Sequence, residues 1–167
     1  MSFKTLTWTR DTYLISTDPA HLQLEAINAA FAEPYTYWTS PFPADKLKHL
    51  LDNSLCIGLY ETSPSTNGKW KQIGFRRLIT DTVTFAYLTD FYVLPEHRGK
   101  GLGKWMQQFT RELLDAIEGS FDRNIRGFRV VTLTKEKNVS FWSETLGVTR
   151  AKQSEDAVYV ERSGFRH

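Results

Sequence analysis

Residues 88–104, LTDFYVLPEHRGKGLGK, join a strand-like run to a helix-like run through a turn that contains three glycines. The part before Pro95 is aromatic and apolar, which is typical of a strand, and apolar side chains recur every three or four positions over 101–119, which predicts a helix. The first N–H groups of a helix lack partners within it, and the positive end of its dipole lies there. Because glycine lets a phosphate approach the backbone, this stretch predicts a pyrophosphate site. Positive charge is added by Arg98, Lys100 and Lys104.

The spacing of these glycines excludes two better-known phosphate loops. A Walker loop requires GxxxxGK[ST], and the dinucleotide-binding fingerprint requires GxGxxG early in a βαβ unit. Residues 99–103 read GKGLG and satisfy neither pattern. The predicted anion site is therefore of another kind.

Periodicity and turn residues predict the elements on both sides of this stretch. The expected strands are 12–17, extended backwards into 4–9, then 54–61, 70–79, 83–93, 129–134 and 158–162. The expected helices are 19–31, started by Asp18–Pro19, then 44–51, 101–119 and 138–146. This order predicts a mixed α/β (α+β) sheet, and 167 residues are the size of one domain, residues 1–167.

The glycine turn also carries a resemblance to a known family. Residues 98–103, RGKGLG, fit the [R/Q]xxGx[G/A] signature of the GNAT superfamily of acyl-CoA-dependent N-acyltransferases, with Val93 five residues before the arginine. The order of elements from about residue 12 to residue 162, including NVSFWSETLG at 138–147, is similar to that of the family. The resemblance implies the GNAT fold, a mostly antiparallel sheet of six to seven strands flanked by about four helices.

The resemblance implies acetyl-CoA (coenzyme A) as the cofactor and a place for it. Its pantetheine arm is expected to lie like an extra strand beside the strand that ends at Val93, whose backbone N–H polarises the thioester carbonyl. Asn138 is expected to bond to pantetheine; the alternative is a helix cap. The implied coenzyme-binding residues are Phe91, Tyr92, Val93, Arg98, Gly99, Lys100, Gly101, Leu102, Gly103, Lys104, Asn138 and Trp142.

Transfer to an amine requires a base for the amine and an acid for the departing thiolate. Asp90, a carboxylate in an apolar run, is the candidate base, because burial would raise its pKa. Alternatively it anchors a neighbouring backbone or an arginine. Strand alternation places Tyr87, Thr89 and Phe91 on one face and Leu88, Asp90 and Tyr92 on the other, so Tyr87 or Thr89 could instead organise a water chain.

The family commonly places a tyrosine acid four residues before the glycine that follows the last helix. Here that position is Ser143, next to Trp142, and a serine hydroxyl is a poor acid. Another hydroxyl, Tyr159 or Tyr92, could supply the proton, as could water. A protein that binds acyl-CoA without efficient transfer is the remaining alternative.

Residues 33–43 contain three prolines and four aromatic residues, which predicts a loop. In the family this part of the fold binds the acceptor, and Tyr35, Tyr37 and Trp38 could form an electron-rich wall for an amine. Packing against the sheet or a dimer contact is an equal alternative.

Composition limits the other possibilities. A net charge of +2 does not indicate nucleic acid or a membrane as partner, and neither a signal sequence nor a membrane span is evident, so a cytoplasmic location is expected. Cys56, the single cysteine, lies in an apolar run and reads as a small buried hydrophobe, and the four histidines form no metal set. The reducing cytoplasm suits a chain that can form no internal disulfide.

The sequence therefore predicts an N-acetyltransferase, an enzyme that moves an acetyl group from acetyl-CoA to a primary amine, most simply that of a small molecule. The alternatives are a non-enzymatic acyl-CoA-binding or sensing domain and an acetyltransferase that acts on a protein lysine or N-terminus. Homodimers are common in the superfamily, so the resemblance allows a homodimer as well as a monomer.

Overall fold

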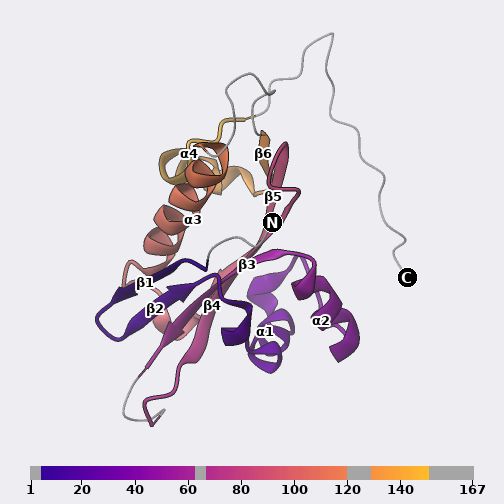
Figure 1. Cartoon of the computed structure of the whole chain (residues 1–167), viewed down its shortest axis with the longest axis vertical. Coiled ribbons are helices and arrows are strands. Elements are labelled where there is room, and N and C mark those ends of the chain that lie inside the picture. Colours follow the sequence, from indigo (N-terminus) through magenta and orange to yellow (C-terminus); the bar gives the residue numbers. More distant parts are fainter. Residues whose placement is uncertain (1–4, 63–66, 120–128, 151–167) are drawn as a thin grey trace.

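The computed structural model describes residues 5–62, 67–119 and 129–150. Within them, six strands form one sheet in the order β1-β2-β3-β4-β5-β6 (Figure 1). Neighbours are antiparallel except β5 and β6, which are parallel. The strands are β1 (Thr7–Arg10), β2 (Tyr13–Ser16), β3 (Leu55–Glu61), β4 (Lys71–Thr80), β5 (Phe85–Val93) and β6 (Arg129–Thr132). The expected mixed, mostly antiparallel sheet is confirmed.

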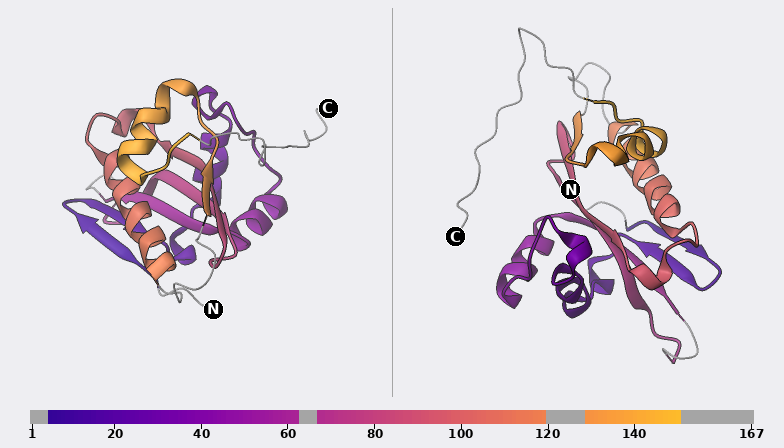
Figure 2. Two further views of the ribbon diagram at one scale, coloured as in Figure 1. Left: turned by 90° about the horizontal axis from the view of Figure 1, so that it is seen from above. Right: turned by 180° about the vertical axis from the view of Figure 1, so that it is seen from behind.

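Two layers of helices cover the sheet. The described helices are α1 (Leu24–Phe31), α2 (Ala44–Asp52), α3 (Leu102–Gly119) and α4 (Val139–Leu146). α1 and α2 lie on one face, and α3 and α4 lie on the other (Figure 2). Short 3₁₀ turns occur at Pro19–His21, Pro34–Thr36, Pro95–His97 and Glu136–Asn138. No described helix is long and apolar enough to span a membrane.

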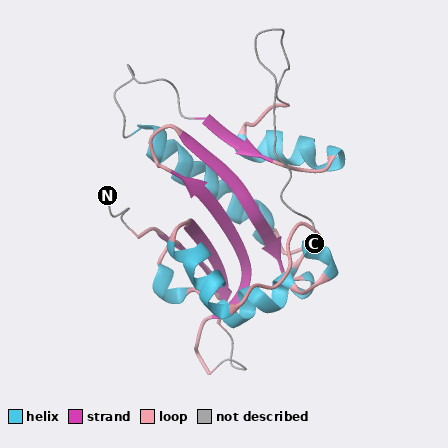
Figure 3. Cartoon of the chain, turned by 90° about the vertical axis from the view of Figure 1, so that its right-hand side faces the viewer, coloured by secondary structure: helices cyan, strands magenta, loops and turns pink. Residues whose placement is uncertain are grey.

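Each face of the sheet has its own hydrophobic core. The apolar stripe of α3, which includes Met106 and Phe109, packs on Ile57, Leu59 and Leu88. On the opposite face, residues of α1 and α2 pack with Phe75 and Tyr92. β4 and β5 run side by side in the sheet (Figure 3). At the end of β5, Val93 belongs to the core on the α3 face and Tyr92 to the core on the α1–α2 face.

Several element boundaries differ from expectation. Asp18–Pro19 begins only a 3₁₀ turn, in which Asp18 accepts from the N–H of Ala20, and α1 begins five residues later than predicted. The N–H of Gln23 donates to the side chain of Gln72 in β4, which keeps Gln23 extended. The predicted backward extension of the first strand is a separate strand, β1, because the chain turns at Asp11 with φ +52°.

The ends of two strands also differ. β5 begins at Phe85, not residue 83, because the side chain of Asp81 accepts from the N–H groups of Val83, Thr84 and Phe85 in a turn. β6 ends at Thr132, two residues early. The strand predicted at 158–162 lies outside the described residues.

A β-bulge interrupts β5 and corrects the predicted alternation of its side chains. Thr89 pairs with Arg77 and Tyr92 with Phe75, so two residues of β5 lie opposite Arg76. Asp90, in the bulge, has φ +50°. Leu88 therefore belongs to the α3 core and Tyr92 to the α1–α2 core, although simple alternation places them on one face.

Candidate functional site

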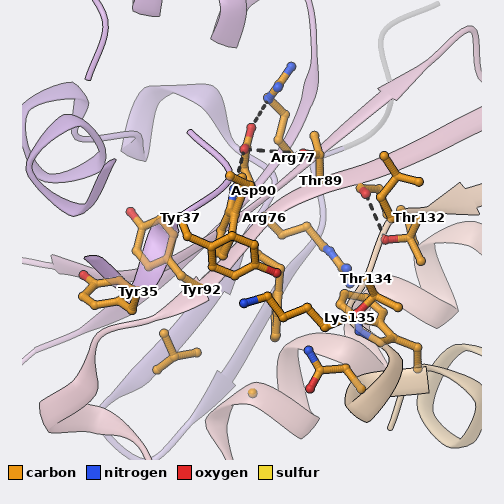
Figure 4. A pocket seen from close by; sticks show the side chains of 18 of the residues that line it. Tyr35, Tyr37, Arg76, Arg77, Thr89, Asp90, Tyr92, Thr132, Thr134 and Lys135 are labelled. Carbon is orange, nitrogen blue, oxygen red and sulfur yellow. Dashed lines mark hydrogen bonds and ion pairs between the residues drawn. The ribbon is translucent and has the colours of Figure 1, made fainter. Parts of the chain in front are cut away.

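A cleft of about 1160 Å³ lies where the end of β5 meets the glycine turn, the aromatic loop 35–42 and the loop after β6 (Figure 4). It gathers candidate residues from four separate stretches of sequence. The predicted site residues that line it are Tyr35, Tyr37, Trp38, Tyr87, Asp90, Phe91, Tyr92, Val93, Arg98, Gly99, Gly101, Leu102, Gly103, Lys104, Asn138 and Trp142. Two predicted residues, Lys100 and Ser143, do not line it.

In the part of the chain that the structure describes, the edge of β5 that faces away from β4 is open along the cleft beyond Leu88. Among described residues, β5 pairs with β6 only over Phe85–Leu88. The N–H of Leu94 donates to the carbonyl of Ile73 on the β4 side at 2.9 Å. Because successive N–H groups of a strand point to opposite edges, the N–H of Val93 points to the open edge. The carbonyl of Val93 accepts from Nε of Arg98 at 3.0 Å, so the N–H is the backbone group of Val93 that a ligand at this edge would use.

The glycine turn leaves space for a ligand. Gly99 and Gly101 have φ of +79° and +74°, which glycine adopts freely, and a Cβ at either position would meet no atom within 4 Å. α3 begins at the next residue, Leu102, so the positive end of its dipole adjoins the turn. Lys104 lines the cleft, whereas Nζ of Lys100 lies 3.4 Å from the hydroxyl of Tyr13.

The side chain of Asp90 has three partners, of which the hydroxyl of Thr89, donating to Oδ1 at 3.4 Å, is the most distant. Nε of Arg77 donates to its Oδ2 at 2.6 Å, and the indole N–H of Trp38 donates to its Oδ1 at 3.1 Å. The side chains of Asp90 and Arg77 are 5% and 13% exposed, so this is a buried ion pair. Asp90 thus anchors an arginine, as in the second alternative of the sequence analysis, and its bond with Trp38 ties the aromatic loop to the bulge of β5.

Arg76, the neighbour of Arg77, lies on the other face of the sheet and is fully buried. Its Cζ is 4.8 Å from the ring centroid of Phe91 and 4.7 Å from that of Trp142. Nη1 donates to the side chain of Gln107 in α3. Burial lowers the pKa of Arg76 to about 9, which leaves the guanidinium charged at neutral pH.

The aromatic loop reaches across the mouth of the cleft. Tyr35 packs under the guanidinium of Arg98, with Cζ 5.0 Å from the ring centroid, and its pKa is raised mainly by burial. Tyr37 is exposed, and Nζ of Lys135 lies 3.7 Å from its ring centroid. The loop after β6 is thus joined to the aromatic loop by a cation–π contact (Figure 4).

Ser143, Tyr92 and Tyr159 carry the hydroxyls considered from the sequence in place of the family's tyrosine acid. The carbonyl of Ser143 accepts from the N–H of Gly147, and Ser143 lies off the cleft. Tyr92 lines the cleft, and burial strongly raises its pKa, so it holds its proton tightly. Asn138 is the N-cap residue of α4, but its side chain makes no capping hydrogen bond there. Tyr159 lies outside the described residues.

Sequence reasoning missed several cleft residues. They are Arg76, Arg77, Thr132, Thr134, Lys135 and Lys137. Two adjacent arginines within the otherwise apolar run of β4 were a usable signal, because charged residues are rarely buried without a purpose. The other four lie at or after the end of β6, where the sequence contains no distinctive pattern.

Cys56 is expected to be inert. It is buried, which raises the pKa of its thiol to about 12, so about one molecule in ten thousand is thiolate at pH 8. A thiol reagent at pH 8 should react with Cys56 only after denaturation, as a time course in buffer and in denaturant will show. Rapid reaction of the folded protein would contradict the buried placement.

The mixed sheet, the open edge of β5 and the glycine turn before α3 together define a GNAT-type acyltransferase fold. A model of the acetyltransferase (GNAT) family matches residues 24–147. A protein of Gibberella zeae, provisionally named an acetyltransferase, is 48% identical over 176 residues, which cover 96% of this chain and 95% of the relative. The chain belongs to the GNAT family of acetyltransferases.

Solved structures agree on the fold. A protein of Xanthomonas campestris pv. campestris, provisionally named a GNAT acetyltransferase, has a TM-score of 0.69 at 26% identity, over 92% of this chain and 96% of that one. Glucosamine-6-phosphate N-acetyltransferase from Arabidopsis thaliana has a TM-score of 0.53 at 17% identity, over 90% of this chain and 100% of that one. The second likeness concerns the fold alone.

Proposed function

We propose that this protein transfers an acetyl group from acetyl-CoA to the primary amine of a small molecule, and that residues 1–167 act as one domain in the cytoplasm. One observation carries the proposal: a glycine turn at a helix N-terminus, an open strand edge and an aromatic loop meet in a single cleft. These are respectively suited to a pyrophosphate, an extended amide-containing arm and an amine.

The residues of the cleft fit acetyl-CoA. Gly99 and Gly101 leave open the space that a Cβ would occupy, at the positive end of α3, where a pyrophosphate would be held. The side chain of Asn138 lines the cleft and makes no capping hydrogen bond to α4, so it suits the amides of the pantetheine arm. When bound, acetyl-CoA supplies an acyl group activated by a thiol leaving group.

The chain's own residues then have separate tasks. The N–H of Val93 polarises the thioester carbonyl, because a donor aimed at a developing oxyanion stabilises it. Asp90 acts as a positioning residue: paired with Arg77, it holds Trp38 and with it the aromatic loop. The hydroxyls of Tyr87 and Thr89, on the same wall, offer partners to a water that receives the amine proton.

A small acceptor is favoured by the contact between Lys135 and Tyr37. It joins the two loops on either side of the cleft mouth, which leaves less room for a protein segment than an open groove would. Lys135 and Lys137, in the loop after β6, line the cleft as well, so an amine that also carries an anionic group suits its charge. The fold relative from Arabidopsis, whose named substrate is an amino-sugar phosphate, is consistent with such an acceptor.

Release of free thiol from acetyl-CoA in the presence of an amine panel tests the proposal. The panel contains amino sugars, amino-sugar phosphates, amino acids, polyamines and a lysine peptide. We expect turnover with at least one small amine and none with the peptide. Turnover with the peptide alone would favour a protein acetyltransferase, and binding of acetyl-CoA without turnover would favour the non-enzymatic alternative, to which the off-cleft position of Ser143 also points.

A further inference from the structure

Arg76 carries a buried positive charge that no described acid neutralises. It is 0% exposed, and within residues 5–62, 67–119 and 129–150 it forms no ion pair. Arg77, by contrast, is paired with Asp90 on the opposite face of the sheet. A buried cation without a counter-charge is costly, so its retention calls for an explanation.

The charge lies in a cluster of unsatisfied donors. Nε and Nη2 of Arg76 and Nε2 of Gln107 are buried, and none has an acceptor among the described residues. Nη1 of Arg76 already donates to Oε1 of Gln107 and lies 3.5 Å from the hydroxyl of Thr110. Three donors without an acceptor point to an anion as their missing partner, because an anion provides both lone pairs and charge.

The cluster lies beside the part of the cleft where the thioester is proposed to react. The guanidinium contacts the ring of Phe91, two residues before Val93, and the ring of Trp142, one residue before Ser143. The side chain extends from β4 toward the loop that carries Thr134 and Lys135, at the open edge of β5 (Figure 4). Arg76 therefore contacts Trp142, the residue of α4 that faces the cleft, whereas the neighbouring Ser143 lies off the cleft.

The proposed reaction creates one anion. The amine nitrogen forms a bond to the acetyl carbon, the carbon–sulfur bond breaks, and its electron pair leaves on sulfur, while the amine proton goes to water. We propose that Arg76 stabilises the departing thiolate of coenzyme A by its positive charge and its unpaired N–H donors, in place of a general acid. This inference rests on the proposed function.

The other cleft groups suit this task less well. Tyr92 belongs to the core on the α1–α2 face, away from Arg76. Lys135 lies over the ring of Tyr37, and Arg98 bonds to the carbonyl of Val93. Asp90, the acid of the cleft lining, is engaged by Arg77 and does not oppose the charge of Arg76.

The experiment measures the thiol pKa of coenzyme A bound to the protein, from the ultraviolet absorbance of the thiolate during a pH titration. This readout needs neither an acceptor nor turnover. A cation close to the sulfur lowers a thiol pKa by about 1–3 units. We expect the bound thiol to titrate at least about one unit below free coenzyme A, and Arg76→Met to remove most of that difference. In parallel, kcat should fall about 100-fold.

A second variant tests the same charge in case Arg76→Met does not fold. Gln107→Glu places a carboxylate where Oε1 of Gln107 already accepts from Arg76, so it neutralises the charge in place and should also raise the thiol pKa. The matched control is Arg111→Met, which removes a cation from the exposed side of α3 and should leave the thiol pKa at the wild-type value.

The outcomes separate this inference from the proposed function. Calorimetry gives the affinity of each variant for coenzyme A, and circular dichroism reports its folding. Suppose that wild type binds coenzyme A, and that the bound thiol has the same pKa in wild type, in Gln107→Glu and, if it folds, in Arg76→Met. Arg76 is then a structural residue and the inference is wrong. If wild type does not bind coenzyme A, the proposed function fails and the inference fails with it.

Discussion

Gly101→Asp should abolish binding of acetyl-CoA and leave the chain folded. Gly101 has φ +74°, a conformation that Asp tolerates better than most residues, and its Cβ would meet no atom within 4 Å. The new carboxylate would adjoin the start of α3, where it suits the helix dipole but repels a phosphate. Two unit charges about 4 Å apart near a surface interact by about 4 kcal/mol, so we expect affinity to fall at least ~100-fold.

Gly101→Asn is the matched control. Asn has nearly the shape of Asp and tolerates the same backbone conformation, but it carries no charge. A calorimetric titration should show no more than about a tenfold loss of affinity for Asn. Equal losses for the two variants would mean that bulk alone acts at Gly101, and unchanged affinity for Asp would show that no phosphate lies at this turn.

Of the variants proposed, Asp90→Asn should lower the free energy of unfolding the most. Removing one partner of a buried ion pair leaves the other charge uncompensated, at a cost of about 3 kcal/mol or more. The Asn amide oxygen and the hydroxyl of Ser54, which accepts from Nη1 of Arg77 at 3.3 Å, carry no charge to balance the guanidinium. For a chain of this size, the melting temperature should fall by about 10 °C. Asn is chosen because it tolerates the φ of +50° at this position, whereas Ala does not.

Asp52→Asn is the control for burial. Asp52 pairs with Lys48 at 2.7 Å, but their side chains are 55% and 65% exposed. Its loss should change stability by no more than about 0.5 kcal/mol. If both variants melt alike, the pair between Asp90 and Arg77 does not stabilise the fold as a buried ion pair should.

The kinetics of Asp90→Asn separate a positioning role from that of a general base. As a positioning residue, Asp90 acts through the indole N–H of Trp38, so Asp90→Asn and Trp38→Phe should both raise the KM for the amine. The pH profile should keep its shape. A general base would instead show a loss of kcat of about 100-fold or more in Asp90→Asn, with loss of the acidic limb and no matching effect in Trp38→Phe.

The glycine turn could be predicted because its signals are local. Gly99 and Gly101 mark backbone conformations that other residues avoid, and the period of apolar residues after them belongs to one helix. Val93 could be placed at the end of a strand by Pro95 alone. The mixed α/β fold class could be predicted from similar local signals, the turn residues and the periods of apolar residues along the chain.

The side chains at the bulge could not be placed in the same way. A bulge is a property of two paired strands, and nothing within residues 85–93 shows that two residues lie opposite Arg76. Alternation therefore assigned Leu88 and Tyr92 to one face. The partner of Asp90 was likewise hidden, because Arg77 and Trp38 come from two other segments and meet it only in the folded chain.

The start of α1 shows the same limit. Asp18–Pro19 is a strong local signal for a helix start, and it does begin a 3₁₀ turn. The α-helix nevertheless begins only at Leu24, because Gln23 is bonded to Gln72 in β4. The backbone N–H of each glutamine donates to the side-chain oxygen of the other. A tertiary contact thus overrides a good local signal.

Calorimetric titration of the protein with acetyl-CoA tests the central claim most directly, with dephospho-coenzyme A and NAD as comparison ligands. The account predicts stoichiometric binding of acetyl-CoA in the micromolar range, weaker binding of dephospho-coenzyme A and no binding of NAD. An absence of acetyl-CoA binding, or equal binding of NAD, would contradict the claim that the glycine turn and the open edge of β5 form an acyl-CoA site.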